Sequence, residues 1–153
     1  MAIGTYYHVT PTGAGAKNGL TWATAFDEPA LEAFLEATVV AGDVIFIESG
    51  TYTLDSAIDW SARDGTGIAP IALIGVTTAP RLGGREGAAI LYSDWATEAN
   101  RPFFDCVTFQ ILASDYNVIR NIYFQGSTNG TVISGGYSVI ENCKFDNDNG
   151  GSG

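Results

Sequence analysis

The chain has 153 residues, 46% of them hydrophobic, which is enough for one domain with a buried core. Its formal net charge of −10 argues against nucleic acid and anionic membranes as partners, because both select basic surfaces. A single histidine leaves little basis for a histidine-based metal site or proton relay. No run of 18 apolar residues is present, and the first thirty residues lack the basic and apolar regions of a signal peptide. We therefore expect a soluble chain.

The N-terminal part predicts a strand, a loop and a helix. Residues 1–10 are β-rich and predict the strand, and residues 11–19 predict a loop because glycine, proline and asparagine cluster there. Asp27 is a suitable N-cap for a helix over residues 29–40, where apolar side chains recur at helical spacing. The predicted contact face of this helix consists of Leu31, Phe34 and Leu35, with Glu32 and Glu36 on the other face.

The middle of the chain predicts short strands separated by loops. The strand segments are 44–47, 58–60, 71–76, 89–92 and 103–109. Two of the loops, 63–67 and 81–87, are rich in glycine and arginine. Exposed loops of this kind commonly contact other chains, and arginine and tryptophan are common interface anchors. The candidate interface residues are Arg63, Arg81, Arg85, Arg101 and Trp95.

Residues 111–145 nearly repeat themselves. The nine residues YNVIRNIYF at 116–124 return as YSVIENCKF at 137–145, with five of nine positions identical at an offset of 21. A period of about 21 with β-branched and aromatic residues at matching places is a solenoid signature. Helical repeats are longer, and the frame of leucine-rich repeats is absent, so the period indicates a parallel β-helix.

The repeat also predicts ladders of side chains along the coils. Asn121 and Asn142 each follow a strand-like run at a corner, where asparagine tolerates the left-handed conformation and can hydrogen-bond to its counterpart. Arg120 falls beside Glu141 at the same offset. This is an exposed ion pair, in contrast to the paired carboxylates of a glycosidase. We therefore predict no catalytic residue.

The remaining reactive side chains favour packing roles. Cys143 takes the place of Ile122 in the repeat and is expected to face inward, although a disulfide with Cys106 stays an open alternative. His8 lies in an apolar strand and is expected to pack with one hydrogen-bond partner. The acidic stretch 146–150 resembles a calcium loop but lacks its terminal glutamate, so neither a metal nor another cofactor is predicted.

Aromatic residues are numerous enough to form a sugar-stacking platform, but a role in the core or in an interface is favoured. The residues concerned are Trp22, Trp60, Trp95, Tyr52, Tyr92 and Tyr123.

Several motifs resemble a known group of proteins. The Tyr-Tyr strand, the Gly/Asn loop, LTWATAF at 20–26, the amphipathic helix and AGDVIFIESGTY at 41–52 are similar to the opening of right-handed β-helix proteins. These form the pectin-lyase-like superfamily, which also includes phage tailspikes and other virion proteins. The resemblance covers most of the chain, and it specifies a fold better than an activity.

We therefore interpret the chain, residues 1–153, as one all-β domain. It is predicted to be a short right-handed parallel β-helix of about five coils of about 21 residues, with an N-terminal capping helix. Residues 1–41 form the strand, loop and cap, residues 42–145 the coils, and residues 146–153 a polar tail. No second cap follows the last coil, so either the natural protein is longer or another molecule covers that end.

The acidic charge, the lack of a signal peptide and of a catalytic cluster, and a fold that depends on neighbouring molecules favour a structural role without catalysis. We expect a homotrimer that decorates or cements a phage capsid at the virion surface, with the chain itself and a capsid or tail protein as partners. Neither nucleic acid nor a membrane is expected as a partner. The alternative is the N-terminal part of a polysaccharide lyase or a glycan-depolymerising tailspike, with a polysaccharide as partner. A carbohydrate-binding module is a third alternative.

Overall fold

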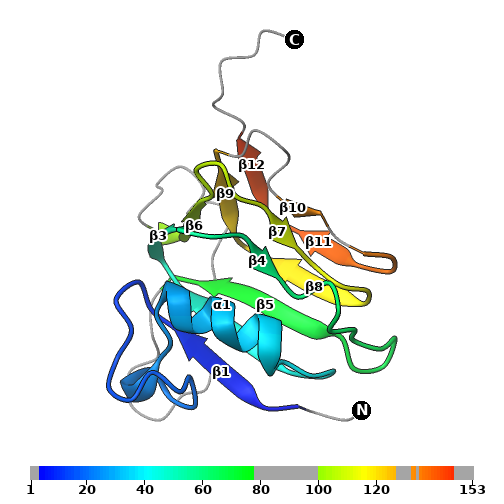
Figure 1. Ribbon diagram of the computed structural model, residues 1–153, viewed down its shortest axis with the longest axis horizontal. Coiled ribbons are helices and arrows are strands. Elements are labelled where there is room, and N and C mark those ends of the chain that lie inside the picture. The colour runs from blue at the N-terminus through cyan, green and yellow to red at the C-terminus, as the bar shows by residue number, and fades with distance from the viewer. Residues whose placement is uncertain (1–3, 78–99, 127–131, 134, 147–153) are drawn as a thin grey trace, which may run out of the picture.

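The computed structural model describes residues 4–77, 100–126, 132–133 and 135–146, and most of their elements are labelled in Figure 1. The elements in chain order are β1 (Tyr6–Val9), the 3-10 helix η1 (Trp22–Thr24), α1 (Glu28–Ala37), β2 (Val44–Glu48), β3 (Gly50–Thr53), β4 (Ile58–Asp59), β5 (Ile71–Val76), β6 (Pro102–Asp105), β7 (Ile111–Leu112), β8 (Asn117–Arg120), β9 (Tyr123–Gln125), β10 (Val132–Ile133), β11 (Val139–Glu141) and β12 (Lys144–Asp146). The expected strand at 89–92 lies outside the described residues.

The strands form three parallel sheets, and the chain visits the sheets in turn. The sheet orders are β1-β2-β5-β8-β11, β3-β6-β9-β12 and β4-β7-β10. Thus β2, β3 and β4 make one coil, β5, β6 and β7 the next, and β8, β9 and β10 a third, on which β11 and β12 continue (Figure 1). All named strand pairs are parallel. The prediction of a parallel β-helix is confirmed.

The coils differ in length, contrary to the prediction of about 21 residues each. Asn121 bonds to Asn142, 21 residues later, across the one coil that the repeat covers. In the other coils the corresponding separations are 38, 28 and 46 residues. The strands stack in register in every coil, so the extra residues lie between strands. The internal repeat therefore gives the length of one coil only, and the other coils are longer.

Helix α1 occupies the first coil on the side of the β4 sheet, and β4 lies against it (Figure 1). Asp27 caps the helix as predicted, because its side chain accepts a hydrogen bond of 3.2 Å from the backbone N–H of Ala30. The helix ends at Ala37, three residues before the predicted end. The backbone N–H groups of Thr38 and Val39 both donate to the Phe34 carbonyl and so close the last turn of the helix. The chain then continues to β2.

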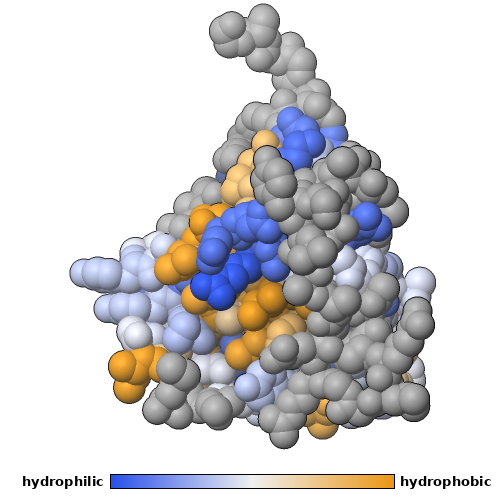
Figure 2. Space-filling model, turned by 180° about the vertical axis from the view of Figure 1, so that it is seen from behind, coloured by the Kyte–Doolittle hydropathy of each residue, from blue (hydrophilic) through white to orange (hydrophobic). Residues whose placement is uncertain are grey.

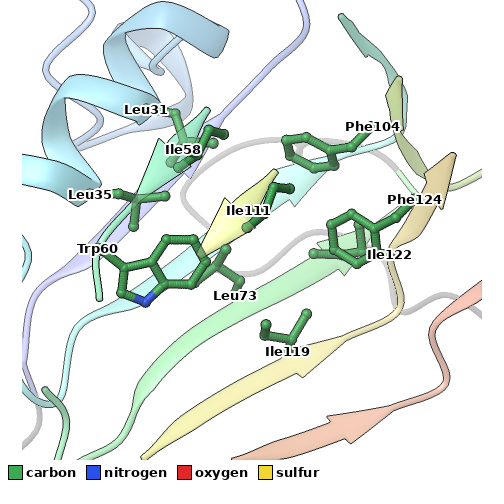
Figure 3. Close-up of a pocket in the computed structure, with 10 residues that line it drawn as sticks. All are labelled: Leu31, Leu35, Ile58, Trp60, Leu73, Phe104, Ile111, Ile119, Ile122 and Phe124. Carbon is green, nitrogen blue, oxygen red and sulfur yellow. The ribbon is translucent and has the colours of Figure 1, made fainter. Parts of the chain in front are cut away.

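The apolar face of α1 closes one side of the core. Leu31 and Leu35 are fully buried and Phe34 is nearly so, as predicted. Figure 3 shows Leu31 and Leu35 pointing toward Ile58 and Trp60 of the next coil, inside a pocket that is wholly apolar. Such an interior stays dry, so it provides packing and no polar binding site.

A row of aromatic rings runs through the coils on the β3 sheet. Tyr52, Phe104, Phe124 and Phe145 occupy the same register position in β3, β6, β9 and β12. Their ring centroids are 5.0, 5.7 and 5.4 Å apart in that order, and each pair is stacked. Stacked aromatic pairs stabilise the ladder beyond their buried area and fix the register of the coils.

The outer edge of β1 is covered by the chain that follows it. His8 donates its backbone N–H to the Gly19 carbonyl (2.8 Å) and accepts from the Phe26 N–H (2.9 Å), and Thr10 N–H donates to the Phe26 carbonyl. The His8 ring is buried and its Nδ1 lies 3.0 Å from the Gly19 carbonyl oxygen, as expected for a packed histidine. No helix among the described residues is long and apolar enough to span a membrane.

Candidate functional site

The last coil exposes apolar side chains that earlier coils bury. Ile140 of β11 pairs with Ile119 of β8, and Phe145 of β12 pairs with Phe124 of β9. The side chains of Ile119 and Phe124 are 1% and 2% exposed, whereas those of Ile140 and Phe145 are 42% and 48% exposed. Within the described residues, the core of the β-helix is therefore open at this end. We call the exposed surface of β11, β12 and Tyr137 the terminal face.

The backbone of the terminal face is also available for pairing. Within the described residues, β11 pairs with β8 on one side and β12 pairs with β9, and neither has a strand on its other side. A strand edge of this kind presents unpaired N–H and C=O groups and is a template for another strand. The terminal face combines such edges with exposed apolar side chains, which is the composition of a docking surface.

The predicted corner ladder is confirmed. Asn121 and Asn142 have φ values of 60° and 53°, and the Asn142 amide donates to Asn121 Oδ1 at 2.8 Å. Tyr137 stacks on Tyr116 with ring centroids 4.9 Å apart, so a second ladder flanks the first. These ladders continue to the terminal face and hold it in register with the coil beneath.

Charged side chains border the terminal face. Arg120 Nε lies 2.8 Å from Glu141 Oε2, which confirms the predicted ion pair. Asp146 was predicted to begin a polar tail, but it is the last residue of β12. Its carboxylate lies 2.9 Å from Lys144 Nζ and accepts a 3.0 Å hydrogen bond from the Tyr123 hydroxyl. These hydrogen bonds, from Lys144 first, lower the pKa of Asp146.

The two cysteines are free thiols with packing roles. Cys106 is buried in the core, and burial raises its pKa to about 12. Cys143 is half-buried at the register position of Ile122, facing the core as predicted, and burial raises its pKa as well. Both thiols therefore resist forming the thiolate that nucleophilic or redox chemistry requires.

The predicted interface arginines that the structure describes make contacts within the chain. Arg63 donates its Nε to the backbone carbonyl of Glu36 (3.0 Å) and so holds the C-terminal turn of α1. Arg101 was expected in an exposed loop, but its side chain is buried and its guanidinium lies 4.5 Å from the centre of the Tyr123 ring. That prediction is wrong, because a cation–π contact within the fold takes up the side chain. Arg81, Arg85 and Trp95 lie outside the described residues.

Three of the six aromatic residues considered for sugar stacking lie in the core. Trp60, Tyr52 and Tyr123 are at most 2% exposed, and Trp60 Nε1 donates to Asn117 Oδ1 at 3.1 Å. The core role favoured from the sequence is confirmed for these three. Trp22 is half-buried against His8, and Tyr92 and Trp95 lie outside the described residues.

The fold brings together three acidic residues that sequence reasoning missed. Glu28 and Glu32, one helical turn apart on α1, meet Asp55 from the connection between β3 and β4. One carboxylate oxygen from each residue lies within 4.8 Å of the other two, so this group could hold a cation. The four-residue spacing of the glutamates was visible in the sequence. Asp55 was not predictable, because only the packing of α1 beside the next coil brings it there.

Glu28 is the unusual member of this group. Its side chain is 6% exposed, and its Oε1 atom has no hydrogen-bond partner. Burial, followed by the charges of Asp55, Glu32 and Asp27, raises the pKa of Glu28 to about 7.

No protein-family model matches the chain, and no curated protein matches it. Its structure is similar to the crystal structure of pectate lyase Pel9A, with a TM-score of 0.53 over 93% of this chain at 21% sequence identity. The chain has a parallel β-helix fold similar to that of this lyase. The chain spans 34% of the length of that lyase, and at 21% identity the similarity establishes the fold alone.

Proposed function

We propose that this pectin-lyase-like β-helix is a structural protein of a virus particle, a homotrimer that decorates or cements a phage capsid. The observation that supports this role is the terminal face, where Ile140 and Phe145 leave the core open beside unpaired strand edges. Apolar surface and strand edges are stabilised when another molecule covers them. In this proposal a capsid or tail protein covers the terminal face, and the flanks of the coils form the contacts of the trimer.

We also propose the handedness of the β-helix, its number of coils and its N-terminal cap. The helix is right-handed and has about five coils if the first, with β1 and α1, is included. Helix α1 and residues 10–26 act as the N-terminal cap, since they cover the β1 edge and the first part of the core. A solenoid with one capped end and one open end fits a module that attaches in one orientation.

Charge favours a partner with a basic surface. The net charge of −10 attracts such a partner over several ångströms. On the side of the molecule seen in Figure 2, apolar residues lie directly beside strongly polar ones, a mixture that is common in interfaces that form between folded partners.

Electron microscopy of particles with and without this chain tests the role. Ordered density that disappears when the chain is omitted supports the proposal, and identical particles contradict it. Phe145→Asp is expected to prevent attachment because it puts a charge on the terminal face. Ile68→Asp is the matched control, because Ile68 is 74% exposed in a loop outside the terminal face. A molar mass of three chains in solution is expected for both variants.

A second candidate is the N-terminal part of a polysaccharide lyase or of a glycan-depolymerising tailspike. The similarity to pectate lyase Pel9A favours it, because the chain matches about a third of a protein with that name. In that case further coils of the same polypeptide cover the terminal face. The length of the parent reading frame and a lyase assay of the whole protein on polygalacturonate distinguish this candidate from the first.

A further inference from the structure

We propose that Glu28, Glu32 and Asp55 bind a calcium ion that links α1 to the connection between β3 and β4. The geometry suits a shared ion, because one carboxylate oxygen from each residue lies within 4.8 Å of the others. Two oxygens that bind one calcium ion at about 2.4 Å are at most about 4.8 Å apart. The two segments are distant in sequence, so the ion would join the N-terminal helix to the coil that follows it.

The orphaned oxygen of Glu28 is the independent observation that points to a ligand. Oε1 of Glu28 is buried and makes no hydrogen bond, the residue is 6% exposed, and one of its carboxylate oxygens lies within 4.8 Å of an oxygen of each of the other two carboxylates. A buried carboxylate oxygen without a partner is costly, and a bound cation removes that cost. The backbone N–H of Ala30 is not available to this oxygen, because it donates to the side chain of the N-cap residue Asp27.

The local charges are unbalanced without an ion. None of the ion pairs formed within the described residues includes Glu28, Glu32 or Asp55. Ser56 donates its hydroxyl to Glu32 Oε1 at 2.6 Å, which orients one carboxylate but brings no charge. Three ionised carboxylates whose ligand oxygens lie within 4.8 Å of one another repel each other, and a divalent cation between them relieves this repulsion.

The ligand chemistry favours calcium over other divalent ions. All the ligand atoms are oxygens, which excludes the nitrogen and sulfur sets preferred by zinc and copper. Glu32 is half-buried and Asp55 is exposed, so water can complete the six to eight oxygen ligands that calcium takes. Magnesium needs a tighter octahedron and releases its waters reluctantly, so it is expected to bind more weakly.

Thermal unfolding of the full chain, followed by circular dichroism, tests the site. Calcium chloride at a concentration about 100 times the dissociation constant is expected to raise Tm by roughly 5–10 °C relative to a chelator. Magnesium chloride is expected to raise it less. Isothermal titration should give one calcium ion per chain. Equal Tm values in chelator and in millimolar calcium, together with no titration heat, would overturn the proposal.

Variants separate ion binding from general packing. Glu28→Gln is expected to raise Tm in chelator, because it replaces a buried charge with a neutral amide, and to abolish the response to calcium. Asp55→Asn provides a second, exposed substitution that leaves the helix intact and should also weaken the response. Glu36→Gln is the matched control, one turn further along α1 and outside the group, and should respond as the wild type does. A wild-type response in Glu28→Gln or Asp55→Asn contradicts the proposal.

Discussion

Glu28 shows how burial and neighbouring charge act on a single carboxyl group. Its pKa is raised from 4.5 to about 7, so the folded chain binds this proton more tightly than the unfolded chain does. The contribution of Glu28 to the free energy of unfolding is therefore fully present below pH 4.5, and this contribution is lost as the pH rises from 4.5 to 7.

The first prediction follows from that shift. In the presence of a chelator, Glu28→Gln is expected to be more stable than the wild type at neutral pH by about 1–2 kcal/mol, a figure reduced for solvent screening. The difference should shrink as the pH falls from 7 toward 4.5, and urea unfolding at several pH values measures it. A difference that is independent of pH would show that Glu28 is not the titrating group.

The second prediction concerns the corner at Asn121. Its φ of 60° favours glycine and asparagine, and its side chain accepts the hydrogen bond from Asn142. Asn121→Ala is expected to cost about 1–3 kcal/mol, because it loses the hydrogen bond and strains the backbone. Asn121→Gly loses the hydrogen bond but not the conformation, so it should cost less. Urea unfolding compares the two, and an equal loss in both variants would exclude backbone strain.

The residue-scale features that the sequence predicted are those that recur. Asn121 and Arg120 have counterparts 21 residues later in a coil without insertions, so alignment of the repeat placed their partners. Arg101 and Asp55 have no counterpart in the repeat, and their neighbours come from other coils. Such contacts depend on the length of each coil, which the loops change from coil to coil, so the 21-residue period does not predict them.

At the scale of elements, α1 depends on its first turn. Asp27 caps the helix and also forms an ion pair with Lys17. The third prediction is that Asp27→Ala costs about 1 kcal/mol, whereas Asp27→Asn, which keeps an N-cap oxygen, costs less than half of that. The decrease in Tm measures both. If Asn is as destabilising as Ala, the ion pair with Lys17 matters more than the cap.

The ends of elements were harder to predict than their existence. The β-branched segment Thr38–Val40 continues the apolar spacing of the helix, which extended the prediction to residue 40. In the structure, two N–H groups share the Phe34 carbonyl, and Asp43 accepts from Val40 N–H, so the chain leaves the helix early. Local hydrogen bonds of this kind outweigh periodicity at an element boundary.

At the scale of the whole molecule, the terminal face predicts self-association. Ile140 is already 42% exposed, so Ile140→Lys should change Tm by less than about 2 °C. The fourth prediction is that this substitution abolishes association beyond the trimer, which is measured in sedimentation as a rise of apparent mass above three chains with concentration. Leu20→Lys is the control, because Leu20 is 53% exposed but lies near the opposite end. Equal association of wild type and Ile140→Lys would contradict the prediction.

The covered edge of β1 limits how copies of the chain can associate through their strand edges. Residues 10–26 hydrogen-bond along that edge, so the start of one molecule offers no strand to the finish of another. Copies that meet through β11 therefore pair face to face, so contacts through this strand edge close after two copies. The seventeen residues 10–26 thus prevent the strand-edge polymerisation into fibres that two open ends would allow.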